Sequence, residues 1–407
     1  MRASAFIFGT DLLDEGPDAV LDNLQQRGGL DSVTFSATYH DARDVFPHNP
    51  KRRVFRNEGD VNWFPVETEH YGSGLVPRQA AAAEGADVLA SLCGHAKTRG
   101  MKVTAWTIFL HNSVLATAHP DCSTLNVYGD PYLTDLCPAN PRVRSYCCEL
   151  AADVVRRPVE RLLAESLHFR PMEHGEHHER YLISLPLEAR SMMSLCFCPH
   201  CRSAATYAGV DVPALQSAIR AALQPVWDDT LHPGQPLLVA DAARDSLAEY
   251  VRVRTTTVTS LVKLVRESIA SSRVPLTFVD HAGTMAHVMH GVTADDDVLS
   301  ASQRLGIDPV AVSTVTDELC VLGYQDTPER LAAVLARYRQ ALGPRAHLSV
   351  ALRPLLPDCQ NEANLLQKIR HAVEAGAQGL EFYHYAMMPL NRLEWIRNGL
   401  AAAGARP

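Results

Sequence analysis

The sequence predicts an α/β fold, a single (β/α)8 TIM barrel. Short runs rich in Val, Ile, Leu and Phe recur along the chain and alternate with helical stretches, as expected of parallel βα units. The length of 407 residues fits one barrel with insertions. No internal repeat and no Pro/Gly/Ser-rich tract divides the chain. We therefore expect one barrel domain over residues 1–407.

Eight strands are expected, which is the number that closes such a barrel. They lie at residues 5–9, 32–37, 102–108, 161–165, 275–280, 319–323, 347–352 and 379–384. Helices are expected at residues 17–27, 78–99, 141–156, 247–271, 327–341 and 361–375. Asp14 and Glu15 lie near the start of the first helix and Gly376 follows the last, in keeping with helix-terminal preferences.

Two connections between expected strands are too long for a simple βα loop. Residues 39–77 follow the second strand, and residues 167–235 follow the fourth. Both leave the carboxyl end of a strand, the face of a barrel where active sites are built. A loop this long in a compact domain is usually a lid or a binding loop, and the alternative is a surface excursion packed around aromatics. We interpret residues 167–235 as an inserted excursion within the single domain.

Composition and charge exclude several classes of protein. Hydrophobic residues make up 46% of the chain, charged residues 21%, and the formal net charge is -8, which argues against nucleic acid as a partner. No run reaches the ~18 apolar residues of a membrane span, and residues 1–11 are typical of a first strand, not of a signal peptide. We expect a cytoplasmic protein that binds a small molecule and is compatible with homo-oligomer formation.

A cysteine group is the most specific motif of the sequence. Cys196, Cys198 and Cys201 have C-x-C-x-x-C spacing around a proline. Three thiols at this spacing can converge on one ion, and a distant fourth thiol completes the tetrahedral shell of structural zinc. Buried free cysteines that act as small hydrophobes are the alternative, which describes Cys320 and Cys359 better than a cluster.

The order of three segments resembles that of glycoside hydrolases of the family 42 β-galactosidase type and their uncharacterised barrel relatives. The segments are Leu-Cys-Pro-Ala-Asn-Pro at 136–141, Ala-Glu-Ser at 164–166 and Cys-Phe-Cys-Pro-His-Cys-Arg at 196–202. The resemblance implies a barrel in which Cys137, Cys196, Cys198 and Cys201 bind structural Zn²⁺. It also implies that Glu165 is the acid/base glutamate at the end of the fourth strand.

Two departures from that family concern the chemistry. The family has Asn before the acid/base glutamate, where this chain has Ala164. The family's nucleophile is a glutamate at the end of the seventh strand, where this chain has Leu352, Arg353 and Pro354. The resemblance therefore supports the fold and the zinc more strongly than the galactosidase activity.

Three carboxylates at expected strand ends are the catalytic candidates. Glu165 follows an apolar strand, where burial favours the protonated form of a general acid; a salt bridge to Arg353 is the alternative. Glycosidic hydrolysis needs two carboxyl groups, about 5 Å apart for retention and further apart for inversion. Asp280 and Glu381 are candidates for the second. Glu381 is slightly favoured because it shares one face of its strand with Tyr383, although a structural role is the alternative for both.

Polar and aromatic side chains also gather at the expected strand ends. Imidazoles at a barrel mouth can donate to sugar hydroxyls, shuttle protons or bind a divalent ion, whereas one histidine alone is more often a packing residue. The candidate substrate-binding residues are His40, Trp106, His111, His281, Tyr324, Arg353 and Tyr383. The charged run at residues 173–180 is either a solvated loop or a second metal site, and no H-x-x-x-H helix pattern frames it.

These patterns predict a hydrolase that acts on a glycosidic or glycoside-like bond. Glu165 would be the proton donor, and Glu381 or Asp280 the nucleophile or base. No G-x-G-x-x-G, Walker or G-x-S-x-G motif stands at a strand-to-helix turn, which argues against nucleotide cofactors and serine hydrolysis. Two alternatives stay open, because a barrel does not fix the reaction. One is a lyase or isomerase of a carbohydrate or C-glycoside that uses histidine proton transfer, and the other is a non-catalytic carbohydrate-binding barrel.

Overall fold

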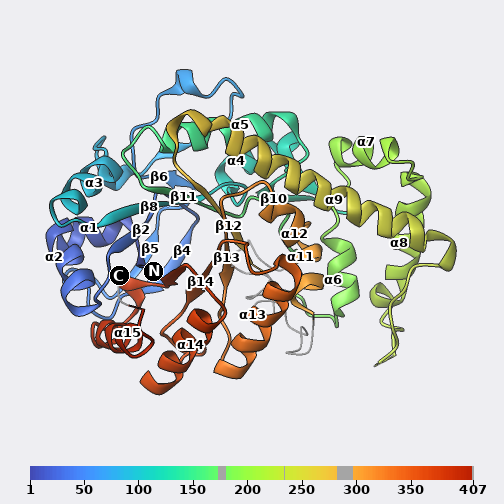
Figure 1. Cartoon of the computed structure of the whole chain (residues 1–407). Coiled ribbons are helices and arrows are strands. Elements are labelled where there is room, and N and C mark those ends of the chain that lie inside the picture. Colours follow the sequence, from blue (N-terminus) through green and yellow to red (C-terminus); the bar gives the residue numbers. More distant parts are fainter. Residues whose placement is uncertain (173–179, 233, 282–296, 406–407) are drawn as a thin grey trace.

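A closed barrel of eight parallel strands forms the centre of the computed structural model, which describes residues 1–172, 180–232, 234–281 and 297–405 (Figure 1). The strands follow one another in chain order, and β15 pairs with β1 to close the ring. All eight expected strands are confirmed, with small differences at their ends. Their bounds are β1 Arg2–Ile7, β2 Ser32–Ser36, β8 Lys102–Ile108, β11 Arg161–Glu165, β12 Leu276–Asp280, β13 Glu318–Leu322, β14 Leu348–Leu352 and β15 Gly379–Phe382.

Helices surround these strands. Their bounds are α1 Gly9–Glu15, α2 Pro17–Asp22, α3 Val88–Thr98, α4 Ser113–Ala118, α5 Pro141–Val154, α9 Asp241–Ser268, α11 Val298–Arg304, α12 Pro309–Ser313, α13 Pro328–Leu342, α14 Glu362–Glu374 and α15 Asn391–Ala402. The expectation of a helix from residue 78 is wrong, because Asp87 caps α3 by accepting a hydrogen bond from the backbone N–H of Ala90 at 2.8 Å. Within the described part of the chain, no helix is long and apolar enough to cross a membrane.

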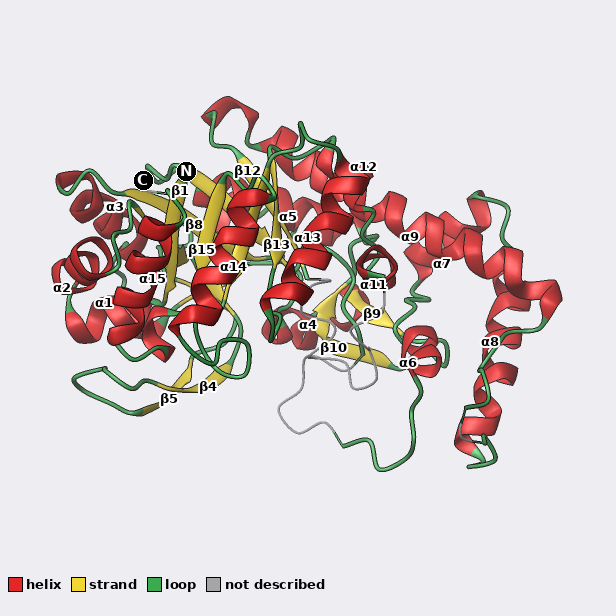
Figure 2. Cartoon of the chain, turned by 60° about the horizontal axis from the view of Figure 1, so that its bottom comes forward, coloured by secondary structure: helices red, strands yellow, loops and turns green. Residues whose placement is uncertain are grey.

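Short strands build the loops at the carboxyl end of the barrel. They are β3 Thr38–Tyr39, β4 Ala42–Val45, β5 Val54–Asn57, β6 Val61–Asn62, β7 Arg78–Gln79, β9 Ser123–Leu125 and β10 Pro131–Leu136. The β4–β5 and β9–β10 pairs are antiparallel hairpins that lie beyond the strand ends (Figure 2). The first of them belongs to the long connection after β2.

The side chains inside the barrel form layers, because alternate residues of each strand face inward. The layer near the amino ends of the strands is a charged network. In it Arg2 donates to Glu318 at 2.7 Å and to Glu381 at 3.0 Å, and Arg161 lies 3.4 Å from Glu318. The next layer is apolar and separates this network from the barrel mouth. It includes Phe6, Trp106, Leu163, Val279, Cys320 and Ala351.

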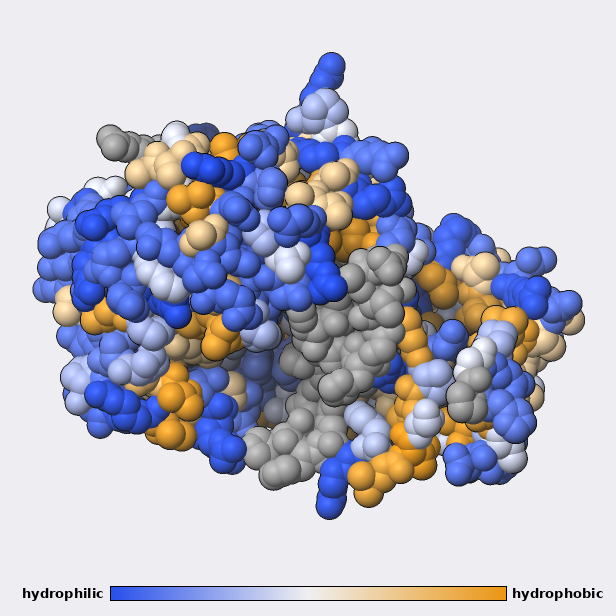
Figure 3. Space-filling view, turned by 90° about the horizontal axis from the view of Figure 1, so that it is seen from below, coloured by the Kyte–Doolittle hydropathy of each residue, from blue (hydrophilic) through white to orange (hydrophobic). Residues whose placement is uncertain are grey.

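The chain after β11 leaves the barrel and forms a helical excursion at one side (Figures 1 and 2). Its helices are α6 Leu187–Met193, α7 Pro199–Tyr207, α8 Val212–Trp227 and the start of α9. They enclose a hydrophobic cluster separate from the barrel core, which includes Met192, Leu215, Ile219, Leu223 and Tyr250. Apolar side chains are also exposed on this part of the surface (Figure 3), among them Tyr181, Leu182, Ile183 and Leu238.

The charged network makes a prediction about stability. Arg2→Met leaves two buried carboxylates without their main cation, so it should lower the free energy of unfolding by about 3–5 kcal/mol at pH 7. Burial raises the pKa of Glu318, but Arg2 and Arg161 lower it more and hold it below its usual value. A depressed carboxyl pKa stabilises the fold above the unfolded pKa of about 4.3, and this stabilisation is lost as the pH falls through the folded pKa.

Urea unfolding at pH 7 and at lower pH measures both effects. The gap between wild type and Arg2→Met should be largest at pH 7 and narrow below about pH 4.3. Arg330→Met is the matched control, because its exposed pair with Asp326 should contribute no more than about 0.5 kcal/mol. A gap that does not change with pH would show that the network does not stabilise the fold through charge.

Candidate active site

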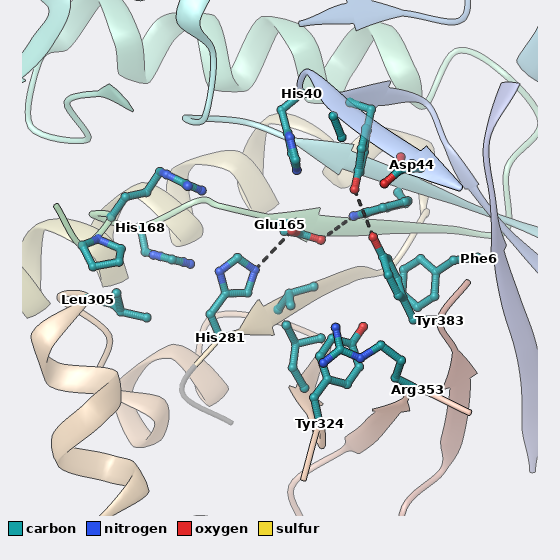
Figure 4. Close-up of a pocket in the computed structure, with 17 residues that line it drawn as sticks. Phe6, His40, Asp44, Glu165, His168, His281, Leu305, Tyr324, Arg353 and Tyr383 are labelled. Carbon is teal, nitrogen blue, oxygen red and sulfur yellow. Dashed lines mark hydrogen bonds and ion pairs between the residues drawn. The ribbon is translucent and has the colours of Figure 1, made fainter. Parts of the chain in front are cut away.

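A cavity of about 310 Å³ opens at the carboxyl ends of the barrel strands (Figure 4). Of the residues that the sequence singles out, its wall includes Glu165, His40, Trp106, His281, Tyr324, Arg353 and Tyr383. His111, Asp280 and Glu381 are not part of the wall. The wall also includes residues that the sequence analysis missed, chiefly Asp44, His168 and Arg170.

Glu165 is the last residue of β11 and faces the cavity (Figure 4). Its Oε2 accepts a hydrogen bond from Trp106 Nε1 at 2.5 Å, and its Oε1 lies 3.3 Å from His281 Nε2. Burial raises the pKa of the Glu165 carboxyl, but His281 and Trp106 lower it more, so the pKa lies below its usual value. The expectation that burial keeps Glu165 protonated is therefore wrong, because two neighbouring donors stabilise the carboxylate.

Asp44 brings a second carboxyl group to the same cavity. It lies on β4, where Ala42 and Asp44 face the cavity while Arg43 and Val45 are exposed. Burial raises the pKa of Asp44 to about 6, although Asn57 Nδ2 donates a hydrogen bond to it at 2.8 Å. Within the described part of the chain, the cavity thus holds two carboxyl groups whose pKa values are shifted in opposite directions. Such a pair suits acid/base chemistry.

The segment that follows β4 is fixed to α1 and to the chain after β15. His48 Nδ1 donates to the carbonyl of Met388 at 2.8 Å. Asn49 and Arg52 donate to the two oxygens of Asp14 at 2.9 and 2.7 Å. These contacts between distant parts of the chain place the β4–β5 hairpin, and with it Asp44, beside the barrel mouth.

Among the described residues, three imidazoles line the cavity and a fourth lies behind His40. His168 Nδ1 donates to the backbone carbonyl of Phe169 at 2.7 Å, and its ring meets that of His281 edge-on at 4.8 Å. His40 stacks on His111 with ring centroids 4.5 Å apart. Burial lowers the pKa of both His40 and His168. The prediction that His111 contacts substrate is therefore not supported by its position, since it packs behind His40.

Aromatic rings and one arginine complete the wall opposite His40 (Figure 4). The hydroxyl groups of Tyr39 and Tyr383 are 3.1 Å apart. Arg353 lies over the ring of Tyr324 at 4.7 Å and forms an ion pair with Asp358. The alternative partner for Glu165 suggested by the sequence, Arg353, is thus bound to another carboxylate.

Asp280 does not face the cavity, so its position does not support its prediction as a catalytic residue. Within β12, Val279 and the following His281 point into the barrel mouth, and Asp280 points outward between them. It is fully buried and accepts hydrogen bonds from Ser302 at 2.9 Å and Tyr338 at 2.8 Å. Its carboxylate therefore joins β12 to α11 and α13.

Glu381 faces the barrel interior as predicted, but its depth does not support its prediction as a catalytic residue. It lies one layer below Tyr383, is fully buried, and binds Arg2 at 3.0 Å and Thr34 at 2.8 Å. The apolar layer lies between this network and the mouth. The alternation along a strand predicts which side of the sheet a residue faces, but it does not predict how deep in the barrel the residue lies.

Four buried cysteines come together where β10 ends and α7 begins. They are Cys137, Cys196, Cys198 and Cys201, and their Sγ atoms all lie within 4.8 Å of one another. Cys137 Sγ is 3.5 Å from Cys198, 3.6 Å from Cys201 and 3.8 Å from Cys196. This cluster can hold a metal ion. The other metal candidate, the charged run at residues 173–180, falls almost entirely on residues 173–179, which lie outside the described residues.

The fold has counterparts among solved structures. It is similar to α-L-fucosidase isoenzyme 2 from Paenibacillus thiaminolyticus, with a TM-score of 0.52, 14% identity, and coverage of 98% of this chain and 48% of that chain. It is also similar to a β-galactosidase from the psychrophilic Marinomonas ef1, with a TM-score of 0.56, 11% identity, and coverage of 98% and 59%. At these identities the likeness shows the barrel fold alone, and the chain spans about half the length of these proteins. No family model and no curated protein matches the sequence.

Proposed function

We propose that the protein is a glycoside hydrolase-like enzyme that cleaves a glycosidic or glycoside-like bond with Glu165 and Asp44. The observation that carries this proposal is the pair of carboxyl groups in one cavity with pKa values shifted in opposite directions. The aromatic wall fits a sugar ring. The barrel's likeness to a fucosidase and a β-galactosidase is consistent with the proposal.

The two environments assign the roles. Glu165 is the ionised group and acts on the anomeric carbon, either directly or through a water molecule. Asp44, whose pKa is about 6, keeps its proton in mildly acidic solution and gives it to the leaving oxygen. This assignment reverses the role of proton donor first expected for Glu165. Trp106 and His281 hold the Glu165 carboxylate in place and keep it ionised.

A lyase or isomerase with histidine proton transfer is the second candidate. The ion pair of His281 with Glu165 at 3.3 Å, together with the neighbouring ring of His168, favours it. In that reaction His281 would move the proton and Glu165 would only orient its ring. Replacing Glu165 and His281 one at a time distinguishes the hydrolase from the histidine-driven lyase or isomerase.

Substitution of the two carboxyl groups tests the hydrolase directly. Glu165→Gln keeps the shape but not the charge, so turnover of a natural glycoside should fall by roughly 10²–10⁴. Asp44→Asn should have a similar effect on that substrate and a smaller one on an activated aryl glycoside, whose leaving group needs little protonation. Wild-type activity should decline above about pH 6, as Asp44 loses its proton, and this decline should be absent from Asp44→Asn.

Asp280→Asn is the control, because this carboxylate ends a barrel strand as Glu165 does but is fully buried and faces α11 and α13. Its folded fraction should retain wild-type turnover while its thermal stability falls. Full activity of Glu165→Gln together with inactivity of His281→Asn would replace the hydrolase with the histidine-driven reaction. No turnover of any glycoside by wild type would favour the carbohydrate-binding barrel.

We also propose that the cysteine cluster binds structural zinc. Thiolates at about 2.3 Å from a tetrahedral zinc lie about 3.8 Å apart, which is close to the distances from Cys137 to the other three sulfur atoms. The backbone N–H of Leu125 donates to Cys196 Sγ at 3.4 Å, and the buried Arg254 offsets negative charge on the cluster. Zinc would join the β9–β10 hairpin to the helical excursion, far from any bond that reacts.

The zinc proposal predicts about one tightly bound zinc per chain. Cys198→Ser should lose the metal and unfold at a lower temperature, because metal binding contributes directly to folding. Cys148→Ser is the control, since Cys148 lies outside the cluster, and it should keep the metal. Elemental analysis of the purified wild type and both variants measures the zinc content per chain. Wild type without stoichiometric zinc would contradict the proposal.

A further inference from the structure

Arg353 directly follows β14, and its side chain lines the cavity. Its Nε is bound by Asp358, and its guanidinium plane rests on the ring of Tyr324 at 4.7 Å (Figure 4). Two contacts on different sides fix the orientation of the guanidinium before any ligand arrives. A fixed guanidinium loses little entropy when it binds a second partner.

The outer edge of this guanidinium is available to a ligand. Among the residues that the structure describes, no acceptor bonds Nη1 or Nη2 of Arg353. The side chain lines the cavity and is 27% exposed. Two parallel N–H donors in one plane match two oxygens of a single anionic group.

The groups packed against Arg353 keep its guanidinium charged. Asp358 is buried and is the carboxylate that pairs with Arg353. The buried ammonium of Lys368 donates to the backbone carbonyls of Asp358 and Gln325 and adds a second cation beside that carboxylate. The carboxylate of Asp326 also interacts with Lys368, so Asp358 is not the sole anion beside that ammonium. Burial lowers the pKa of Arg353, but Asp358 raises it more, so the guanidinium stays charged. An anion from solution is attracted to its open side.

We infer that Arg353 binds an oxyanion substituent of the substrate, the carboxylate of a uronic acid or the sulfate ester of a hexose. This inference rests on the proposed function, in that the sugar bearing the anion lies between Glu165 and Asp44. The inference also explains why an arginine follows β14, where the family that the sequence resembles has its catalytic glutamate. A cation at this position would bind the sugar and would not take part in the reaction. A neutral hexose would leave the paired donors of Arg353 without a matching acceptor.

Binding of free monosaccharides to the full chain tests the inference without any need for hydrolysis. Calorimetry at pH 7 would compare glucuronic and galacturonic acids with glucose and galactose, and the 6-sulfates of both hexoses form the second arm. At least one anionic sugar should bind roughly 10- to 100-fold more tightly than its neutral counterpart. Tighter binding of the uronic acids would identify a carboxylate as the substituent, and tighter binding of the 6-sulfates would identify a sulfate ester.

Two variants of Arg353 show whether that preference comes from its donors. Arg353→Met keeps an apolar stem against Tyr324 and should remove the preference, whereas Arg353→Lys keeps the charge without the paired donors and should retain part of it. Arg337→Met, which removes an exposed arginine paired with Asp297, should bind like wild type. Circular dichroism and melting temperature confirm that each variant is folded.

Equal affinity of wild type for anionic and neutral sugars would overturn the inference. So would an unchanged anion preference in folded Arg353→Met, and so would the absence of any binding by an anionic sugar. A chain that binds uronate through Arg353 but cleaves no uronide would instead contradict the hydrolase and leave the anion site in place. The two proposals therefore fail by different measurements.

Discussion

The inward alternation of eight strands in a closed barrel is the constraint on which the other features depend. It stacks a charged layer around Arg2, an apolar layer around Leu163, and a polar mouth around Glu165. The apolar layer keeps the two sets of carboxylates apart, so that those below stabilise the fold and those above are open to a ligand. Residues two positions apart, such as Glu381 and Tyr383, consequently lie in different layers.

The candidate site depends on segments added to this frame. The β4–β5 hairpin supplies Asp44, the end of β12 supplies His281, and β8 supplies the Trp106 indole that donates to Glu165. Each acts on the carboxyl groups through desolvation or a hydrogen bond, and in this way the pKa values of two acids in one cavity are shifted in opposite directions. The cysteine cluster lies outside the cavity, where the end of the β9–β10 hairpin meets the start of α7.

The fold was predictable from the sequence because each barrel strand is a short apolar run with a local signal. The cavity position of Glu165 was predictable for the same reason, since it ends such a run. The positions of Asp280 and Glu381 outside the cavity were not predictable, because strand position does not reveal which neighbour will bind a carboxylate or at what depth it lies. Asp44 was missed because its place depends on contacts from His48, Asn49 and Arg52 to distant residues. The local signal for Asp44 was its position two residues after Ala42 on a short strand, which puts both side chains on the same side.

Chemical rescue of Glu165→Ala by azide tests whether the Glu165 carboxylate acts at the anomeric carbon. On an aryl glycoside that wild type cleaves, azide should restore turnover and yield a glycosyl azide with the anomeric configuration opposite to that of the substrate. The inverted configuration requires that azide attack the anomeric carbon from the space that the Glu165 carboxylate occupies in wild type. A product of unchanged configuration would make Glu165 the acid/base group. Rescue of Glu381→Ala or Asp280→Ala in place of Glu165→Ala would contradict the account.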